Sequence, residues 1–438
     1  MSAIAQLPWW ALLLMAVGLL ALGTLVLNLF SSIGERPSDA DQVGSCRLDS
    51  IDFLLALAGV INAPLHRGGT ARLLNNGDEF FPAMLEAISK AERSINFTTY
   101  IWQDGRVSDD FFDALTERAR AGVEVRVLVD GFGAMRAPNS LIDALREAGG
   151  RWEYFNRPTF GKLTRIHRRT HRRALLIDGL TGFTGGAAVL DKWLGSAQDA
   201  EHWRDCMVEV RGRLALSLQS AFTQLWAHTT GELISGEDFY PLHAHDAEHL
   251  GEGEYISRHV NVISSPSSQA HPMRHVFWFS IRSARERVFI TNPYFVPDDI
   301  LAEVLRERAA DGVDIRILLP GDEIDLPLIR WASQSYYDAL LEAGVRIYEY
   351  QPTMIHQKLL VADGIWSLVG SVNMDVRSKE LNQENALGLL DPGFAQQVEE
   401  TFFADLENAV EIDLATWRRR PAYRRVVERF FRLFEEQF

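Results

Sequence analysis

Residues 83–131 read AMLEAISKAERSINFTTYIWQDGRVSDDFFDALTERARAGVEVRVLVDG. Residues 277–321 repeat the same pattern as FWFSIRSARERVFITNPYFVPDDILAEVLRERAADGVDIRILLPG. Each stretch runs from a helix through a strand and an acidic turn to a second helix, a glycine and a second strand. Gly122 and Gly312 stand where a helix ends before the next strand-forming run, 123–129 in the first stretch and 313–319 in the second.

The similarity continues downstream of both stretches. Residues 141–155 (LIDALREAGGRWEYF) correspond to residues 336–350 (YYDALLEAGVRIYEY). Helix–glycine–strand alternation of this kind predicts α/β layers with largely buried strands. Two copies of one unit predict two lobes related by a pseudo-twofold axis, each a mixed β-sheet flanked by helices.

The composition is that of a globular protein with a sizeable core. The 438 residues are 47% apolar and 24% charged, and the formal net charge is −15. An acidic molecule is not drawn as a whole to nucleic acid or to anionic lipid, so an anionic substrate requires a local basic patch. Cys46 and Cys206 lie far apart in the sequence, and they build neither a disulfide framework nor a Cys/His metal motif.

The N-terminus carries an apolar run over residues 9–30, which is about the length that crosses a bilayer as a helix. Trp9 and Trp10 lie where an interfacial anchor is expected. We expect residues 1–34 to form a retained single-pass transmembrane helix in a bacterial inner membrane. A cleaved signal peptide, the alternative, has a shorter apolar run between positive charges and a small-residue cleavage site. The positive charges after the span favour a cytoplasmic catalytic portion.

The rest of the chain divides by composition and by the repeat. We expect a tether with a short helix over residues 35–66, a first repeat over 67–235, a polar linker over 236–257, a second repeat over 258–412, and a basic amphipathic helix over 413–438. Histidines of the linker (His243, His245 and His249) are interpreted as exposed side chains and not as a metal site. The C-terminal helix either lies at a membrane interface or packs on the catalytic lobe.

Each repeat ends in a strand-like segment with a histidine, a cation two positions on and an aspartate five beyond that. These residues are His171, Arg173 and Asp178 in the first repeat, and His356, Lys358 and Asp363 in the second. Residues i and i+2 of an extended chain share a face, so the histidine can act on a phosphorus atom while the cation neutralises a phosphate oxygen. We expect the aspartates to orient the segment.

The sequence around His171 is strongly basic. Its cationic or titratable residues are Arg157, Lys162, Arg165, His167, Arg168, Arg169, Arg172 and Arg173. This patch predicts a funnel for an anionic substrate, in which Arg165, Arg168 and Arg169 are the candidate phosphate or lipid contacts. A solvated basic loop is the alternative.

The twice-repeated H-x-K-x-x-x-x-D pattern, with the downstream Gly370-Ser371-Val-Asn373, resembles the phospholipase D superfamily. The runs ITNPYFVPDD (290–299), YYDALLEAGVRIYEYQP (336–352), NMDVRS (373–378) and LNQE (381–384) are similar to bacterial cardiolipin synthases. The resemblance covers about residues 68–420. It departs from the usual pattern at Arg173, which replaces a lysine, and at Ala188, which stands where an asparagine often lies.

The resemblance implies a reaction without metal or cofactor. One histidine attacks the phosphodiester phosphorus and forms a phosphohistidine, and the other protonates the leaving alcohol and then deprotonates the incoming one. By analogy His171 attacks and His356 is the acid and base, although the departures in the first motif leave this division open. The resemblance also implies a supporting set: Arg173, Lys358, Asn373 and Ser371 around the phosphate, with an acid from the same repeat orienting each histidine, Glu384 for His356 and Asp205 for His171.

These features predict a cardiolipin synthase-type phosphatidyltransferase. It would transfer a phosphatidyl group from phosphatidylglycerol to the hydroxyl of a second phospholipid and release glycerol, with phosphatidylethanolamine as a further candidate substrate. The alternatives are a phospholipase D that passes the group to water or another alcohol, a superfamily nuclease, and an inactive lipid-binding scaffold. The membrane anchor and the negative net charge argue against nucleic acid as a partner. The sequence leaves the oligomeric state open.

Overall fold

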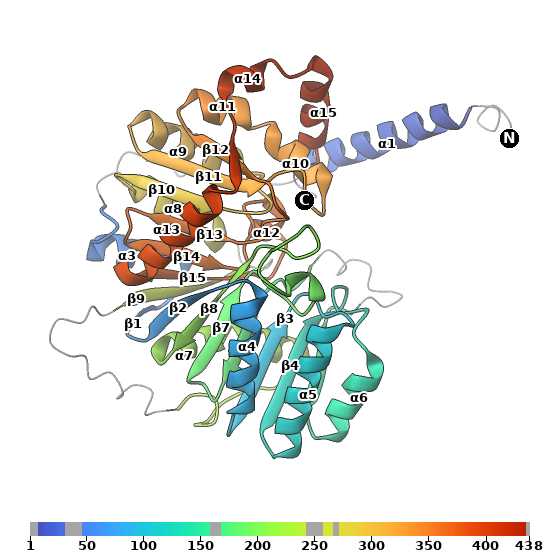
Figure 1. Ribbon diagram of the computed structural model, residues 1–438, viewed down its shortest axis with the longest axis vertical. Helices are drawn as coiled ribbons and strands as arrows, with labels where there is room; N and C mark the ends of the chain where they lie inside the picture. The colour runs from blue at the N-terminus through green and yellow to red at the C-terminus, as the bar shows by residue number, and fades with distance from the viewer. Residues whose placement is uncertain (1–7, 31–45, 158–167, 242–256, 266–270, 435–438) are drawn as a thin grey trace.

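The computed structural model describes residues 8–30, 46–157, 168–241, 257–265 and 271–434. The chain forms two α/β lobes, one above the other in Figure 1, and each lobe is built around one β-sheet. Part of the predicted tether and most of the predicted linker, with its three histidines, lie outside the described residues.

The first sheet has seven strands in the order β2-β8-β7-β6-β3-β4-β5. They are β2 (Thr70–Asn75), β3 (Ser94–Thr99), β4 (Glu124–Asp130), β5 (Arg151–Phe155), β6 (Ala174–Ile177), β7 (Thr181–Gly185) and β8 (Cys206–Arg211). Strands β3, β4 and β5 are parallel, and the other neighbours are antiparallel. Apolar side chains of α4 (Asn76–Ser89), α5 (Arg106–Arg120) and α6 (Asn139–Glu147) cover one face, and α7 (Arg213–Thr230) covers the other.

The second sheet has nine strands in the order β1-β9-β15-β14-β13-β10-β11-β12-β16. They are β1 (Leu65–Arg67), β9 (Arg258–Ile263), β10 (Arg287–Thr291), β11 (Asp314–Pro320), β12 (Arg346–Tyr350), β13 (Leu359–Ala362), β14 (Trp366–Gly370), β15 (Asn385–Leu390) and β16 (Ala409–Glu411). Its faces are covered by α8 (Pro272–Ser283), α9 (Asp299–Ala310) and α11 (Tyr337–Glu342) on one side and by α13 (Pro392–Leu406) on the other.

The two sheets share one strand order, which confirms the predicted duplication. The run β8-β7-β6-β3-β4-β5 corresponds strand by strand to β15-β14-β13-β10-β11-β12. The strands expected at 123–129 and 313–319 are β4 and β11, each shifted by one residue. Gly122 and Gly312 end the preceding helices with φ angles of 92° and 93°, a conformation that side-chain-bearing residues rarely adopt.

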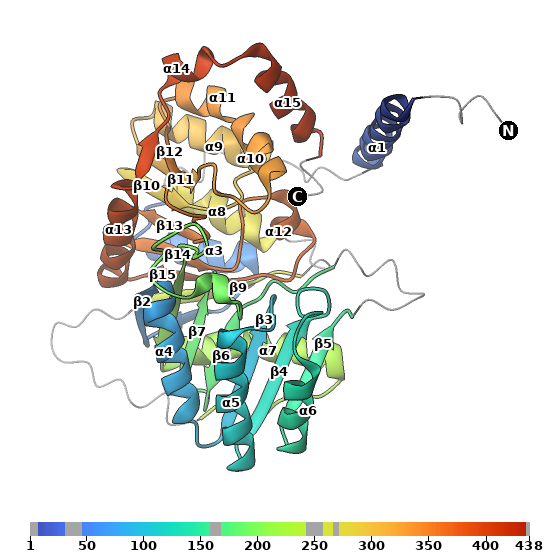
Figure 2. The ribbon, with the colours of Figure 1, turned by 45° about the vertical axis from the view of Figure 1, so that its right-hand side comes forward.

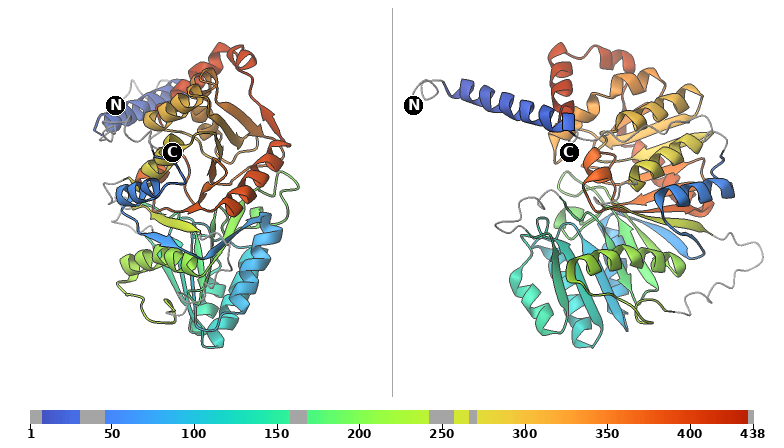
Figure 3. Two further views of the ribbon diagram at one scale, coloured as in Figure 1. Left: turned by 90° about the vertical axis from the view of Figure 1, so that its left-hand side faces the viewer. Right: turned by 180° about the vertical axis from the view of Figure 1, so that it is seen from behind.

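The two lobes share a hydrophobic core, so each buries part of its apolar surface against the other. Val208 and Leu218 of the first lobe pack in the same cluster as Phe289, Val361 and Phe402 of the second. Figure 3 shows the two lobes against each other from the side and from behind. The histidine segments meet at this junction.

The segment before the first repeat joins the second lobe, which the sequence did not indicate. The short helix expected within residues 35–66 is α3 (Ile51–Ile61), and its Phe53, Leu54 and Leu57 are buried in the core of the second lobe. Strand β1 follows and pairs with β9 at the edge of the second sheet. The chain then crosses to the first sheet at β2.

Residues Trp9–Phe30 form helix α1, which stands apart from both sheets in Figures 1 and 2. Among the described residues, no helix combines the length and the apolar character that crossing a membrane requires. The transmembrane anchor over residues 1–34 therefore stays a prediction.

The C-terminal segment forms two short helices instead of the single helix predicted. They are α14 (Leu414–Arg418) and α15 (Ala422–Arg432), separated around Pro421. Helix α15 lies on α10 (Pro327–Gln334), with ring centres of Phe431 and Trp331 5.0 Å apart. One face of α15 thus packs on the catalytic lobe, while Tyr423 and Val426 are exposed.

Candidate active site

Both histidines lie where the two lobes meet, three residues before a central strand of their own sheet. The backbone N–H of His171 donates to the carbonyl of Gln383 at 2.8 Å, and that of His356 donates to the carbonyl of Arg204 at 2.7 Å. Each histidine segment is therefore paired with a segment of the other repeat. Since Gln383 and Arg204 directly precede Glu384 and Asp205, this pairing also brings an acid beside each ring.

The acids are exchanged between the repeats, so the pairing predicted from the sequence is wrong. Nδ1 of His171 lies 3.0 Å from both carboxylate oxygens of Glu384, and Nδ1 of His356 lies 2.7 Å from Oδ2 of Asp205. Isolated parallel bridges pair Thr170 with Gln383 and Ile355 with Arg204, which places each ring beside the acid of the opposite repeat. An acid that accepts the Nδ1 proton leaves the Nε2 lone pair available for chemistry.

The two acids are supported differently. The hydroxyl of Ser371 donates to Oε2 of Glu384, whereas the indole N–H of Trp193 donates to Oδ2 of Asp205 at 2.8 Å. Gly186 occupies the position that corresponds to Ser371, and a Cβ there would lie 2.3 Å from Oδ1 of Asp205. The glycine therefore makes room for the carboxylate. Sequence reasoning missed Trp193, because nothing local distinguishes it from a core tryptophan.

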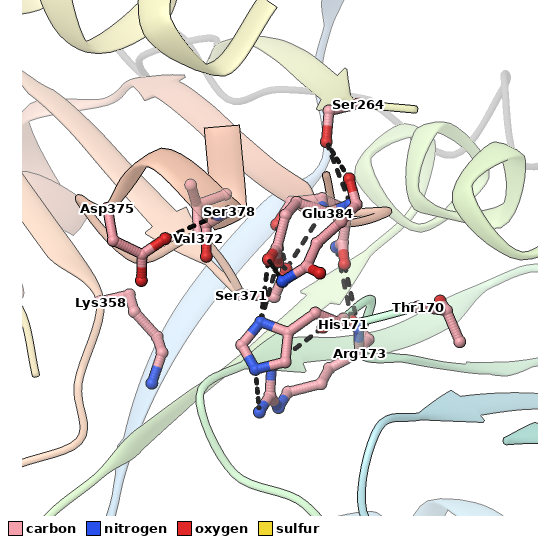
Figure 4. A network of polar contacts seen from close by, with 12 residues as sticks. Thr170, His171, Arg173, Ser264, Lys358, Ser371, Val372, Asp375, Ser378 and Glu384 are labelled. Carbon is pink, nitrogen blue, oxygen red and sulfur yellow. Dashed lines mark hydrogen bonds and ion pairs between the residues drawn. The ribbon is translucent and has the colours of Figure 1, made fainter. Parts of the chain in front are cut away.

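The cations share a face with their histidines, as the i, i+2 spacing predicts. Nη2 of Arg173 lies 3.1 Å from Nε2 of His171, and Nη1 donates to the carbonyl of His171 at 2.9 Å. Nζ of Lys358 lies 2.9 Å from Nε2 of His356 and donates to its carbonyl at 2.6 Å. Figure 4 shows His171 between Glu384 and Arg173. Each Nε2 atom thus has a basic side chain beside it.

Burial dominates the electrostatics of these side chains. The pKa of His171 is lowered to about 4 and the pKa of His356 to about 3, mainly by burial and also by the neighbouring cations, against the opposing effect of the acids. Burial also lowers the pKa of the Lys358 ammonium to about 7. Both imidazoles are therefore neutral at pH 7 before an anion binds.

A cleft of about 380 Å³ opens over the two histidines. Aromatic rings form part of its wall: Tyr100 packs edge-on against His171 with ring centres 5.1 Å apart, and Trp203 stacks on His356 at 5.5 Å. Further lining residues from the second lobe are Tyr294, Asp325, Leu326, Ile329, Asn373, Asp375, Arg377, Ser378 and Asn382. Several of these stand in the runs quoted above for the resemblance. Tyr100 and Asp325 gave no signal in the sequence.

The structure brings only part of the predicted phosphate-binding set to the cleft. Asn373 and Arg169 line it, and Arg169 is held 3.6 Å from the carboxylate of Asp130. Arg168 is exposed and does not line the cleft. Arg165 lies outside the described residues.

Arg172 does not belong to the exposed basic funnel that the sequence suggested. It is fully buried at the lobe junction, where it donates to the carbonyls of Ala221 and Ser264 and to the side chain of Gln383. Its charge therefore ties the lobes together and does not face solvent.

The motif aspartates lie at the far ends of β6 and β13, away from the histidines, and neither lines the cleft. Each clamps the start of the neighbouring strand through three backbone N–H groups, those of Glu92, Arg93 and Ser94 for Asp178 and those of Arg285, Glu286 and Arg287 for Asp363. They therefore orient the strands and do not take part in the chemistry at the cleft. In the described part of the chain, no group of three or more histidine, cysteine or acidic side chains is placed to hold a metal ion.

The sequence matches a family model described as cardiolipin synthase, PLD-like domain, over residues 84–226 and 279–406. It is 34% identical to cardiolipin synthase 2 of Bacillus anthracis over 363 residues, which cover 83% of this chain and 69% of that protein. It is 35% identical to the cardiolipin synthase of Geobacillus sp. (strain WCH70) over 384 residues, which cover 87% of this chain and 75% of that protein.

The fold is similar to that of two solved structures. Phosphatidylserine synthase of Haemophilus influenzae Rd KW20 matches with a TM-score of 0.67 at 15% identity, covering 88% of this chain and 97% of that one. Polyphosphate kinase of Porphyromonas gingivalis matches with a TM-score of 0.53 at 14% identity, covering 84% and 54%. At these identities the likeness describes the fold alone.

Proposed function

We propose that this chain, which belongs to the cardiolipin synthase family with a phospholipase D-like domain, transfers a phosphatidyl group from phosphatidylglycerol to the hydroxyl of a second phospholipid. The observation that carries the proposal is the pair of histidines at one cleft, each with an acid on Nδ1 and a cation beside Nε2. With phosphatidylglycerol as the acceptor, the product is cardiolipin and glycerol is released. Phosphatidylethanolamine is a second candidate substrate.

In the first step Nε2 of His171 attacks the phosphorus of the donor lipid. A phosphorus–nitrogen bond forms, the bond from phosphorus to the glycerol oxygen breaks, and His356 gives that oxygen a proton. In the second step His356 takes the proton of the acceptor hydroxyl, whose oxygen attacks phosphorus while the phosphorus–nitrogen bond breaks. The neutral state of His171 favours its role, because the attacking lone pair must be free.

His356 must be protonated for the first step, although its pKa is low in the empty cleft. A bound phosphodiester adds a negative charge beside Nε2, which raises the pKa of the ring together with Asp205 on the other side. Substrate binding and protonation of His356 are thus coupled. Arg173, Lys358 and Asn373 stabilise the charge that develops on the phosphate oxygens.

Exposed apolar side chains support a membrane-bound substrate. Phe132 packs under the guanidinium of Arg169 at 5.4 Å, and Leu326 lines the cleft and is itself nearly half exposed. Leu328 and Trp331 of α10 are also exposed. A lipid headgroup can reach the histidines while its acyl chains meet this rim. We place the enzyme at the bacterial inner membrane, with the catalytic portion on the cytoplasmic side of an anchor in residues 1–34.

Lipid product analysis tests the proposal. Purified protein is incubated in micelles of phosphatidylglycerol, with and without phosphatidylethanolamine, and compared with His171→Ala and with the matched variant His228→Ala, which lies on α7 outside the cleft. We expect cardiolipin and free glycerol from the wild type and from His228→Ala, and neither from His171→Ala. Phosphatidic acid as the only product would make the enzyme a hydrolase, and no lipid turnover would contradict the proposal.

A further inference from the structure

The cleft has two walls of opposite chemistry. Arg173 and Lys358 place positive charge beside the histidines. The wall formed by the second lobe instead presents oxygen acceptors from Asp325, Asp375 and Asn382. A phosphodiester fits the first wall, whereas the two carboxylates of the second wall disfavour a further anion although Arg377 also lines it. The second wall therefore suits the part of the substrate that carries hydrogen-bond donors.

Asn382 has an acceptor that the protein leaves unused. The residue lines the cleft and is 93% buried, with an exposed fraction of 7%. Nδ2 donates to Oε1 of Glu384 at 3.3 Å, which fixes the orientation of the amide. Oδ1 then has no hydrogen-bond partner within the described residues. A buried acceptor without a partner is costly, so a donor supplied by a ligand is expected there.

Asp375 adds a carboxylate to the same wall. It caps the N-terminus of α12 (Val376–Glu380), where Oδ1 accepts the backbone N–H of Ser378 at 2.6 Å, as Figure 4 shows. Its side chain is buried, and no ion pair with it is found in the part of the chain that the structure describes. Its pKa is raised to about 6, mainly by burial and also by the nearby Glu384. Hydroxyl donors are good partners for such an oxygen, since they need no opposite charge.

Tyr294 and Asp325 extend this wall toward His356. The hydroxyl of Tyr294 donates to both carboxylate oxygens of Asp325, at 2.7 and 2.8 Å, and its ring centre lies 6.5 Å from that of His356. The ring of Tyr294 thus connects this wall to the proposed general base. Arg377 lines the same wall, so an ammonium group would meet a positive charge there.

We propose that Asp375 and Asn382 form a subsite for the glycerol headgroup, binding one hydroxyl through their oxygens while the neighbouring hydroxyl faces His356. The inference rests on the proposed function and explains how the enzyme selects its acceptor. The leaving group of the first step and the nucleophile of the second are both glycerol hydroxyls. One subsite therefore serves both steps: glycerol departs from it, and the glycerol headgroup of the acceptor lipid takes its place.

Soluble acceptors test the subsite. The full chain in phosphatidylglycerol micelles is given labelled glycerol, 1-propanol or ethanolamine, and the phosphatidyl products are quantified over a range of acceptor concentrations. Asp375→Asn keeps the N-cap of α12, because asparagine caps a helix as well as aspartate does. The matched control is Asp391→Asn, an aspartate that caps α13 and does not line the cleft.

We expect Asp375→Asn and Asn382→Ala to raise the KM for glycerol at least about tenfold, the effect of one lost charge-assisted or buried hydrogen bond. Because the glycerol headgroup of the donor lipid uses the same subsite, both variants should also slow the first step. The acceptor preference is therefore measured as the ratio of glycerol to 1-propanol products, which should fall at least about tenfold, whereas Asp391→Asn should leave this ratio unchanged. Equal losses with glycerol and 1-propanol would overturn the subsite in favour of a structural role. A selective loss with ethanolamine would overturn it in favour of an ammonium site. No transfer to any alcohol by the wild type would defeat the proposed function itself.

Discussion

Nδ1 of His171 lies 3.0 Å from the carboxylate oxygens of Glu384, a residue 213 positions away in the other repeat. The reciprocal contact joins His356 to Asp205, 151 positions away. Each histidine thus depends on the opposite lobe for the acid that orients it. A single repeat contains a histidine and an acid, but the acid that contacts the Nδ1 atom of that histidine comes from the other repeat.

The exchange predicts which acid serves which step. A phosphatidyl ester of p-nitrophenol needs no proton on its leaving group. Its first step therefore needs His171 as the nucleophile but no proton from His356. Glu384→Gln should slow the burst of p-nitrophenol by about 100-fold or more, while Asp205→Asn should leave the burst within about threefold of the wild type. Stopped-flow absorbance measures both. The reverse order would mean that His356, the partner of Asp205, is the nucleophile.

Gly186 should be intolerant of any side chain. Because a Cβ would lie 2.3 Å from Oδ1 of Asp205, Gly186→Ala must displace the carboxylate from His356. We expect turnover of phosphatidylglycerol to fall at least about 100-fold, with a loss of about 1–3 kcal/mol in the free energy of unfolding. Gly59→Ala on α3 is the matched control, since a Cβ there meets nothing within 4 Å. Full activity of Gly186→Ala would show that the position of Asp205 is not critical.

The pKa of Lys358, lowered by burial to about 7, predicts a limit on activity at high pH. The ammonium is charged below its pKa and neutral above it, so phosphate stabilisation is lost as the pH rises through that value. In the free enzyme kcat/KM should therefore fall above about pH 7. Lys358→Arg should move the fall to higher pH, because a guanidinium keeps its proton. An unchanged pH profile in this variant would mean that a group other than Lys358 causes the fall in kcat/KM.

Arg172 should matter for stability more than for substrate binding. Its guanidinium satisfies the carbonyls of Ala221 and Ser264 across the lobe junction, and Arg172→Met leaves these acceptors buried without a partner. We expect the free energy of unfolding to fall by about 3 kcal/mol, measured by urea denaturation. Arg168→Met, at an exposed position nearby, should change it by less than about 0.5 kcal/mol. A comparable change in both variants would contradict the role of Arg172 at the junction.

The repeats, their central strands and the shared face of each histidine and its cation follow from the sequence, because they rest on local periodicity and short spacing. The exchange of Asp205 and Glu384 does not, since both repeats hold one acid and a linear sequence fits either pairing. Only the placement of the two sheets decides it. The same holds for Arg172, whose neighbours in the sequence are basic but whose partners lie on α7, on Gln383 and beside β9.

Two further features depend on tertiary placement. Strand β1 and helix α3 precede the first repeat, yet they complete the second lobe through β9 and its apolar core. Tyr294 and Asp325 are separated by a helix and a strand, and their contact forms only when the loop after β11 folds back over the cleft. No local pattern marks either relationship.

The central claim is a phosphatidyl group carried on His171, and trapping that intermediate tests it most directly. The wild-type enzyme is mixed with radiolabelled phosphatidylglycerol, quenched in base within the first turnover, and digested for peptide mass spectrometry. The account predicts a base-stable, acid-labile label on His171, absent from Glu384→Gln. A label on His356, or turnover to cardiolipin without any labelled protein, would contradict it.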